Sequence, residues 1–506
     1  MSMNTQGRPT GPGTAAPATS SGAALLPDEK LLFEIGDIGH SGVDLPEVEI
    51  GGDFLGGFAR TAPLALAGLT EPEAMRHYVR LSRLNYSIDG GMYPLGSCTM
   101  KHNPRLNEKL ARLPGFADIH PLQPVSTVAG ALALMDELAH WLMTLTGTAA
   151  VCLTPKAGAH GEMAGMMAIR AAHLASGANG RNVVLVPESA HGTNPATAAF
   201  LGYAVRTIPA RDDGTVDVAA VKAALGSDVA ALMLTNPNTC GLFEPEVIEI
   251  AAAVHAAGAY FYCDGANFNA IMGVVRPGDL GIDAMHINLH KTFSTPHGGG
   301  GPGAGPVVLS AALAPFAPVP FMRAGELVEH AEGTHLGRIT AFNGQMGMYV
   351  RALAYMLSHG GDGLAQAARD AVLNANYVKA RLGGTFSLPY GDGPCMHEAL
   401  FDDSFLEGTG VTTLDFAKAM IDEGFHPMTM YFPLVVHGAM LVEPTESESL
   451  QTLDQFCDTM LALAAAAKAG DAARFTAAPT RAPRRRLDET RAARQPRLKW
   501  EAPAEV

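Results

Sequence analysis

Short apolar runs alternate with stretches of helical apolar spacing between residues 128 and 289, and this alternation constrains the fold most. Buried strands that alternate with helices form a mainly parallel sheet covered by those helices. The sequence therefore predicts an α/β fold here. The expected helices are 128–144, 162–175, 196–202, 218–225 and 246–257. The expected strands are 149–154, 182–186, 205–208, 229–234, 260–263 and 285–289.

The pattern changes on both sides of this region. Beyond residue 362 the helices become longer, with strand-like pieces near Thr385 and at residues 428–434, which predicts a smaller α+β domain. The stretch before residue 122 is rich in proline and loops, as in a segment that wraps a neighbour. We expect five parts: a disordered leader (1–29), a wrapping segment (30–125), a large domain (126–361), a small C-terminal domain (362–470) and a tail (471–506).

Charge and cysteine content exclude several classes of protein. The chain has 35 basic and 50 acidic side chains, a net charge of −15, which argues against binding to nucleic acid or an anionic membrane. No apolar run reaches membrane-spanning length, and the leader lacks the apolar stretch of a secretory signal. Six scattered cysteines without a CxxC pair indicate reduced thiols in the cytoplasm. We expect no metal site.

A small-residue turn, residues 155–161 (PKAGAHG), stands between a predicted strand and a predicted helix. Small residues such as Gly158 and Ala159 let backbone N–H groups approach a phosphate at the start of a helix, where the helix dipole also favours an anion. A tight βα connection without a ligand explains the same pattern equally well.

Asp264 ends an apolar predicted strand (YFYCD). A carboxylate in that position is half buried and needs a cationic partner. A protonated pyridine nitrogen is such a partner, and pairing with the acid keeps the ring an electron sink. A capping aspartate that accepts hydrogen bonds from nearby backbone N–H groups is the alternative.

Lys291 lies at the end of the next predicted strand, in NLHKTFSTPH, with His290 beside it and glycines 298–301 after it. Lysine amines form Schiff bases with carbonyl cofactors, helped by partial desolvation. A surface lysine beside a glycine-rich turn is the alternative. An acid and then a lysine at successive strand ends favour the cofactor interpretation, because each could partner one end of the same ring.

Three further clusters suit the same site. His191, in SAHGTNP with Thr193, follows a strand and could stack on a pyridine ring; a hydrogen-bonded turn histidine is the alternative. Residues 235–239 (TNPNT) could place amides near a substrate, although Asn-Pro is a common turn former. Residues 93–101 (YPLGSCTMK) form a polar loop that could enter the site from this chain or a neighbour.

With these motifs in order, the sequence closely resembles the P-protein of the glycine cleavage system, second subunit of the two-subunit form. The resemblance continues through LPGF (113–116), IHP (119–121), GFHP (424–427), YFP (431–433), EPTE (443–446) and RLDE (486–489). It departs at Met92 and His102 beside the YPLGSCTMK loop, and residues 337–344, which include Asn343, match only in part.

The resemblance implies a fold-type-I enzyme with pyridoxal 5'-phosphate. Lys291 would be the Schiff-base lysine, Asp264 would partner the pyridine nitrogen and His191 would stack on the ring. Gly158, Ala159, Thr193 and His290 would lie near the cofactor. The implied reaction is glycine decarboxylation with aminomethyl transfer to the lipoyl arm of H-protein, by a heterotetramer with a related first subunit. Another fold-type-I decarboxylase, an aminotransferase and a non-catalytic scaffold subunit stay open as alternatives.

Overall fold

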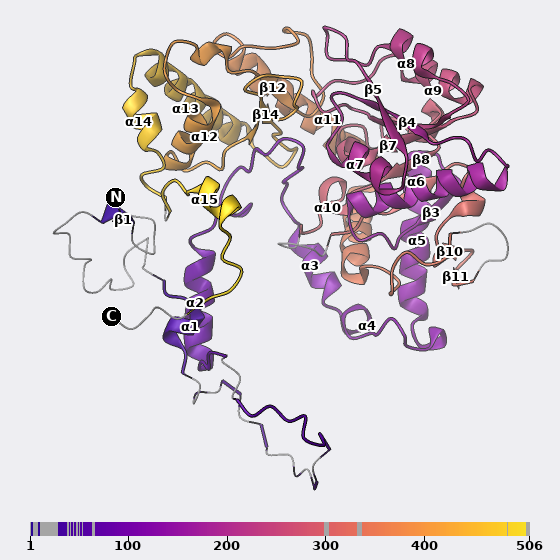
Figure 1. Ribbon diagram of the computed structural model, residues 1–506, viewed down its shortest axis with the longest axis horizontal. Coiled ribbons are helices and arrows are strands. Elements are labelled where there is room, and N and C mark those ends of the chain that lie inside the picture. Colours follow the sequence, from indigo (N-terminus) through magenta and orange to yellow (C-terminus); the bar gives the residue numbers. More distant parts are fainter. Residues whose placement is uncertain are drawn as a thin grey trace. The chain divides into compact units, whose positions relative to one another are not determined.

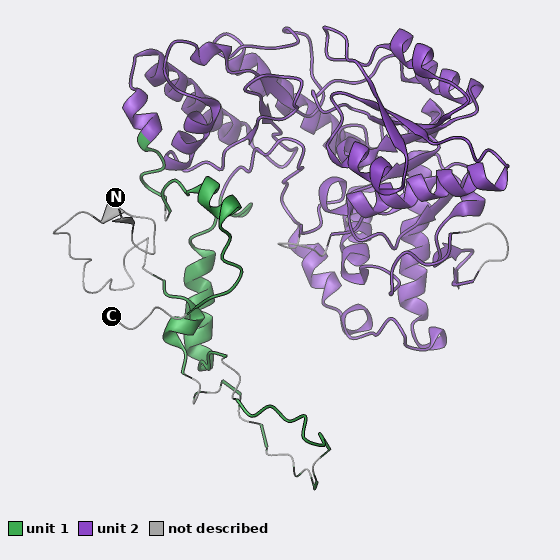
Figure 2. Cartoon of the chain, in the orientation of Figure 1, with its two compact units in different colours: residues 1–90, 477–506 green, residues 91–476 purple. Residues whose placement is uncertain are grey.

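The computed structural model describes residues 66–297, 303–330, 336–482 and 484–501, and before them 2–3, 9–10, 29–37, 40, 42–43, 45–46, 49, 51–52 and 54–62. The expected disordered leader lies outside the described residues except at 2–3, 9–10 and 29. The chain divides into two compact units, residues 91–476 and residues 1–90 with 477–506 (Figure 2). No helix among the described residues is long and apolar enough to cross a membrane. All six cysteines are free thiols.

One seven-stranded sheet forms the core of residues 150–309 within unit 91–476 (Figure 1). Its strands are β3 (Ala150–Cys152), β4 (Val183–Pro187), β5 (Ala204–Ile208), β6 (Val229–Thr235), β7 (Tyr260–Asp264), β8 (Ala284–His286) and β9 (Val307–Leu309). They lie in the order β3-β9-β8-β7-β6-β4-β5. Strands β4 to β8 pair in parallel, and only β9 is antiparallel to its neighbours β8 and β3. The predicted mainly parallel sheet is confirmed.

Helices cover both faces of this sheet because its strands are apolar on both sides. In β4, Val183 and Leu185 belong to one buried cluster, whereas Val184 and Val186 belong to the other, which is the period-two alternation of a strand. The first cluster contains residues of α5 (Ala129–Thr146), α8 (Val218–Ala224), α9 (Val247–Ala256) and α11 (Met346–Leu382). The second contains residues of α6 (Gly158–Ala175) and α7 (Thr193–Phe200).

Three local differences from the sequence predictions matter for the site. Helix α6 begins at Gly158 rather than at residue 162, so the small residues form its first turn. Strand β8 ends at His286, and the chain then forms the short helix α10 (Leu289–Thr292) that carries Lys291. Lys291 therefore belongs to a helical turn and does not end the strand. The predicted strand near Thr385 is absent, since Thr385 lies in a turn after α11.

A smaller three-stranded antiparallel sheet lies in the second half of unit 91–476. It has the order β12-β14-β13, with β12 (Ala399–Phe401), β13 (Thr429–Met430) and β14 (Met440–Val442). Helix α11 links the two sheets and is kinked at Gly360, where φ is +63°. The other elements of this unit are α3 (Arg105–Ala111), α4 (Pro114–Ala117), β10 (Phe321–Arg323), β11 (Glu326–Val328), α12 (Thr413–Asp422), α13 (Leu450–Lys468) and α14 (Ala472–Ala477, whose last residue opens the other unit).

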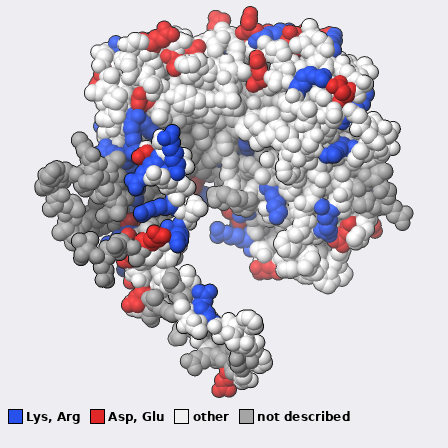
Figure 3. All heavy atoms as spheres, viewed as in Figure 1, with Lys and Arg blue, Asp and Glu red and all other residues white. Residues whose placement is uncertain are grey.

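The other unit, 1–90 with 477–506, contains α1 (Leu32–Ile35), α2 (Glu71–Ser82), α15 (Glu489–Arg494) and the short strands β1 (Ser2–Met3) and β2 (Pro9–Thr10). Glu29 accepts hydrogen bonds from His77 and Arg80 of α2 and fastens the chain before α1 to that helix. Over residues 91–476, acidic and basic side chains are interspersed on the face shown in Figure 3.

Candidate active site

A cavity of about 210 Å³ opens where the parallel strands end at their carboxyl termini. Open parallel sheets bind ligands at this edge, because the loops that follow the strands converge there. Ser97, Glu162, His286 and Asn288 also line the cavity. All seven residues singled out from the sequence line it: Gly158, Ala159, His191, Thr193, Asp264, His290 and Lys291.

Asp264 is buried at the end of β7 and is surrounded by groups that favour its charged form. Its Oδ2 accepts a hydrogen bond from Asn194 Nδ2 at 3.0 Å, and its Oδ1 accepts one from the Ala266 backbone N–H at 3.0 Å. His286 Nε2 lies 3.5 Å from Oδ1. Burial raises the pKa of Asp264, but His286, these hydrogen bonds and Lys291 together hold it below its ordinary value. The carboxylate is therefore ionised and ready to bind a cation.

Glu162, which was not predicted from the sequence, is a second buried acid in the cavity wall, on the second turn of α6. Asn194 Nδ2 donates to Glu162 Oε2 at 2.8 Å as well as to Asp264, so one amide joins the two carboxyl groups. Burial and the Asp264 charge raise the pKa of Glu162 to about 7. The site thus separates two acids, one ionised and one able to hold a proton near neutral pH.

His191 follows β4 and lines the cavity with a partly buried ring. Its Nδ1 is 2.9 Å from Thr193 Oγ1 and accepts a hydrogen bond from the Thr193 backbone N–H at 3.2 Å, so Thr193 orients the ring. The Phe432 ring lies edge-on at 5.5 Å between centroids. Partial burial and Lys291 lower the pKa of His191 more than Asp264 raises it, which favours a neutral ring.

Gly158 and Ala159 form the first turn of α6, whose leading N–H groups have no intrahelical acceptor. A Cβ at Gly158 would lie 2.6 Å from Asn288 Nδ2 and 2.9 Å from His286 Nε2, so only glycine lets the backbone approach this wall. The wall is itself fixed, because His286 Nε2 is 2.9 Å from Asn288 Oδ1 and His286 Nδ1 is 2.7 Å from Tyr262 OH. An anion can therefore reach the helix N-terminus across small residues.

Lys291 reaches the cavity from α10, and its Nζ donates a hydrogen bond to the Ser97 carbonyl oxygen at 2.8 Å. His290 lies next to it, and its Nε2 is 3.3 Å from Asn288 Nδ2. Burial, His297 and Lys291 lower the pKa of His290 to about 3, so its ring is neutral. The glycine-rich loop predicted to move, residues 298–301, lies outside the described residues.

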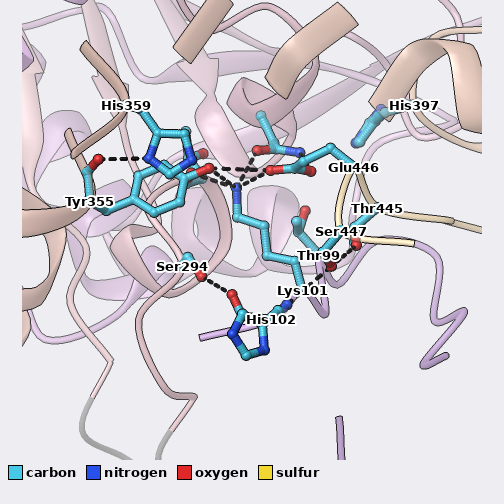
Figure 4. Close-up of polar contacts among 12 residues, drawn as sticks. Thr99, Lys101, His102, Ser294, Tyr355, His359, His397, Thr445, Glu446 and Ser447 are labelled. Carbon is cyan, nitrogen blue, oxygen red and sulfur yellow. Dashed lines mark hydrogen bonds and ion pairs between the residues drawn. The ribbon is translucent and has the colours of Figure 1, made fainter. Parts of the chain in front are cut away.

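The YPLGSCTMK loop of this same chain supplies part of the cavity wall through Ser97. Lys101, at the end of the loop, is buried and donates to Glu446 Oε1 (2.6 Å), Asn269 Oδ1 (2.8 Å), the Thr292 carbonyl (2.8 Å) and Tyr355 OH (3.2 Å). Figure 4 shows its amine enclosed by Tyr355 and Glu446. Because Thr292 follows Lys291, Lys101 anchors the turn that carries the cavity lysine.

Only weak sequence signals pointed to the missed residues. Glu162 is the one charged residue among the small and apolar residues 157–169 of α6, apart from His160. His286 ends β8 and, like Asn288 two residues later, faces the cavity. A rule that inspects every polar residue at a strand end would have found His286. Glu162 needs the packing of α6 on the sheet, because a lone acid on a helix is usually solvated.

The residues present fit pyridoxal phosphate. Asp264 offers an ionised acid to the pyridine nitrogen, Lys291 an amine to the aldehyde and the first turn of α6 its N–H groups to the phosphate. Thr235 Oγ1 is buried and has no hydrogen-bond partner among the described residues, and Thr235 also lines the cavity, so the site holds a hydroxyl for a bound group.

This fold and this site define a fold-type-I pyridoxal-phosphate enzyme. Residues 161–334 match the class-V aminotransferase family, and residues 367–481 match the glycine dehydrogenase C-terminal domain. A crystal structure of glycine decarboxylase (P-protein) of the glycine cleavage system, in inhibitor-bound form, shares the fold with a TM-score of 0.67 and 21% identity, covering 82% of this chain and 93% of that one.

Relatives extend the match over the whole chain. The probable glycine dehydrogenase (decarboxylating) subunit 2 of Caulobacter vibrioides is 68% identical, covering 98% of each chain. That of Listeria welshimeri is 48% identical, covering 93% of this chain and 98% of its own. The chain belongs to the glycine dehydrogenase (decarboxylating) subunit 2 family.

Proposed function

We propose that this chain is the cofactor-carrying subunit of a glycine decarboxylase, which removes CO2 from glycine and passes the remaining aminomethyl group to the lipoyl arm of H-protein. The family supports pyridoxal-phosphate-dependent glycine decarboxylation in the glycine cleavage system. The observation that carries the proposal is that Asp264, which ends β7, and Lys291, which follows the adjacent parallel strand β8, line one cavity. The transfer to the lipoyl arm extends the proposal beyond that geometry.

Each cavity residue then has a role. Bound pyridoxal phosphate supplies a cationic ring that accepts the electron pair left when CO2 departs. Asp264 would hold the proton on the ring nitrogen, His191 would cover the ring, and Lys291 would bind the aldehyde carbon. The α6 turn at Gly158 and Ala159, with Thr193, would hold the phosphate, and His290 would support the wall beside Lys291. Glu162, with its raised pKa, can hold a proton beside Asp264.

We further propose a cytoplasmic heterotetramer, with two copies of this chain and two of the first subunit that the family name implies. The stretch before residue 91 supports this, because it exposes Phe54, Phe58, Met75 and Tyr78, and exposed aromatic and apolar residues are typical of interaction surfaces.

The proposed domain limits (30–125, 126–361, 362–470) are supported by the sheets, since β3 to β9 lie within 150–309 and β12 to β14 within 399–442.

The first experiment is the visible spectrum of the chain, alone and with its first subunit, before and after borohydride reduction. We expect a band that reduction removes and a modified peptide that maps to Lys291. A variant at Lys222, an exposed lysine paired with Glu249, should retain the band and the modification. No band in either preparation would refute the catalytic proposal and favour a scaffold subunit.

The substrate is tested by exchange of labelled CO2 with the carboxyl group of glycine. A glycine decarboxylase catalyses this exchange, whereas an aminotransferase does not cleave that bond. Exchange with glycine but not with alanine or glutamate would distinguish this activity from other fold-type-I decarboxylases. Transfer of the label-free aminomethyl group to lipoylated H-protein is then followed by mass spectrometry of that protein.

A further inference from the structure

Two buried glutamates face each other beside the active site, on the smaller sheet. Strand β12 pairs with β14 in antiparallel register, with Ala399 opposite Val442. Glu398 and Glu443 are the next residues outward along the two strands, so they continue this register, and their exposed fractions are 0% and 2%. Like charges directly opposite each other on paired strands repel, and burial removes the water that would screen them. Two ionised carboxylates are therefore strongly disfavoured here.

Each glutamate uses one oxygen to hold the YPLGSCTMK loop. Glu398 Oε1 accepts a hydrogen bond from the Ser97 backbone N–H, and Glu443 Oε1 accepts one from Thr99 Oγ1 at 2.5 Å. The other two oxygens, Glu398 Oε2 and Glu443 Oε2, are buried without a donor among the described residues. Buried acceptors without a partner are costly, and one hydrogen placed between the two carboxyl groups would satisfy both.

The charges around the pair allow one negative charge but not two. Burial raises the pKa of Glu398 to about 7, and burial together with Glu398 raises the pKa of Glu443 well above its ordinary value. Burial also lowers the pKa of the adjacent His397 to about 3, so its ring is neutral and adds no positive charge. Lys101 is already paired with Glu446 at 2.6 Å. Lys291 is the cation that lowers the pKa of both glutamates.

We propose that Glu398 and Glu443 share a single proton, and that this singly charged pair positions Lys291. It acts through the Ser97–Thr99 segment, whose Ser97 carbonyl accepts the hydrogen bond from Lys291 Nζ at 2.8 Å. The negative charge of the pair also attracts the Lys291 ammonium group. Cys98 lies within the Ser97–Thr99 segment, and its Sγ is 3.8 Å from His297 Nδ1. Burial raises the pKa of the Cys98 thiol and lowers the pKa of the His297 imidazole, so both groups are uncharged.

A shared proton makes a distinctive prediction for glutamine variants. Replacing either glutamate by glutamine keeps one negative charge, and the new amide N–H donates to the remaining carboxylate as the shared proton did. Glu398→Gln and Glu443→Gln should therefore each leave the Lys291 amine nearly unchanged. Only the double variant removes the last negative charge, so its effect should far exceed the sum of the two single effects.

The test measures how fast an amine-specific reagent modifies Lys291 in the full-length, cofactor-free chain, as a function of pH, with peptide mapping. We expect both single variants to stay within about twofold of the unaltered chain and the double variant to react on the order of tenfold faster, the factor that corresponds to about 1.4 kcal/mol of lost charge attraction. Glu407→Gln, an exposed glutamate of the same region, is the matched control. Equal stepwise effects of the two single variants would show two ionised carboxylates and overturn the proposal.

Infrared spectra of the unaltered chain and the single variants give a second test, which does not require the double variant to fold. The unaltered chain should show a protonated carboxyl band at mildly alkaline pH that disappears in either single variant, and Glu162→Gln identifies the separate contribution of Glu162. Because one atom each of His397, Glu398 and Glu443 lies within 4.8 Å of the others, Zn²⁺ is the control ligand. Stoichiometric Zn²⁺ binding lost in both single variants would also overturn the proposal. The assay uses no glycine, so a negative result here is distinct from a failure of the proposed function. Only the catalytic consequence of positioning Lys291 rests on the proposed function.

Discussion

Two lysines have opposite surroundings: Lys101, which ends the YPLGSCTMK loop, and Lys291, which donates a hydrogen bond to that loop. Lys101 is 4% exposed and donates to four oxygens, one of them the carboxylate of Glu446. Lys291 is partly exposed, lines a cavity and donates to one backbone carbonyl, that of Ser97. An amine that is enclosed and fully hydrogen-bonded has no free lone pair and no space to react. An amine with one weak partner beside a cavity can exchange that partner for a ligand. From this comparison we expect Lys101 to support the fold, and we propose that Lys291 supports the reaction.

The largest effect is expected for Lys291→Ala. It removes one hydrogen bond from a charged donor, so the free energy of unfolding should fall by about 1.5–3 kcal/mol. Glycine decarboxylation should fall by roughly 10³-fold or more, because no other group in the cavity can bind the aldehyde carbon. Denaturant unfolding and the CO2 exchange assay measure the two. If Lys291→Ala were strongly destabilised while its folded fraction retained activity, the roles of the two lysines would be reversed.

Asp264→Asn tests the acid that faces Lys291 across the cavity. Asparagine keeps the size of the side chain but cannot hold a proton on a ring nitrogen, so activity should fall on the order of 10²–10³-fold while the cofactor stays bound. Steady-state exchange rates and the visible spectrum measure both properties. Asp392→Asn, at an exposed turn, serves as the control. Near-normal turnover in Asp264→Asn would mean that the acid only caps the turn at Ala266.

Lys101→Met should show the reverse pattern, with a large loss of stability. It leaves Glu446 buried without its cation, so the free energy of unfolding should fall by about 3–5 kcal/mol. Lys222→Met, at an exposed ion pair, should change it by less than about 1 kcal/mol. Denaturant titration gives both values. A loss in Lys101→Met no larger than that of the exposed control would contradict the structural role.

The pH dependence of this loss follows from the two partners. The pKa of Glu446 is lowered below 4.5, mainly because Lys101 outweighs burial, so its contribution is present above that value and lost as pH falls through the lowered pKa. The pKa of Lys101 is raised above 10.5 because its partners outweigh burial, so its contribution is present below that value and lost as pH rises through the raised pKa. The difference between Lys101→Met and the unaltered chain should therefore be greatest between these limits.

The smallest effect is expected for Glu162→Gln in the cofactor-free chain. The pKa of Glu162 is raised to about 7 from 4.5, so the unaltered chain keeps its full stability below pH 4.5 and loses part of it as pH rises toward 7. Glutamine does not ionise, so the variant should be more stable at mildly alkaline pH by roughly 1–3 kcal/mol. Thermal unfolding at several pH values measures this. Parallel curves for the two chains would show that folding does not shift the pKa of Glu162 and would contradict this prediction.

Several residues that line the cavity could be predicted because their signals are local. Gly158, His191, Asp264 and Lys291 each follow an apolar run, and parallel strands bring such positions to one edge of the sheet. The same reasoning placed Lys291 on the strand itself, because the apolar run 285–289 hides the helical turn that begins at Leu289. The glutamates that hold the loop could not be predicted, since Glu398 is 301 residues from Ser97 and Glu443 is 344 from Thr99.

The sequence by itself determined the α/β class, the order of the strand-end motifs and the family, because periodicity and contiguous motifs are properties of neighbouring residues. Only the tertiary structure decided that one amide, Asn194, joins two acids and that Glu398 and Glu443 face each other. It also decided that the Lys101 amine is fully hydrogen-bonded, whereas the Lys291 amine is not. These facts depend on which distant segments share a buried space. Burial sets the energy of a charge, and burial is decided by packing rather than by local sequence.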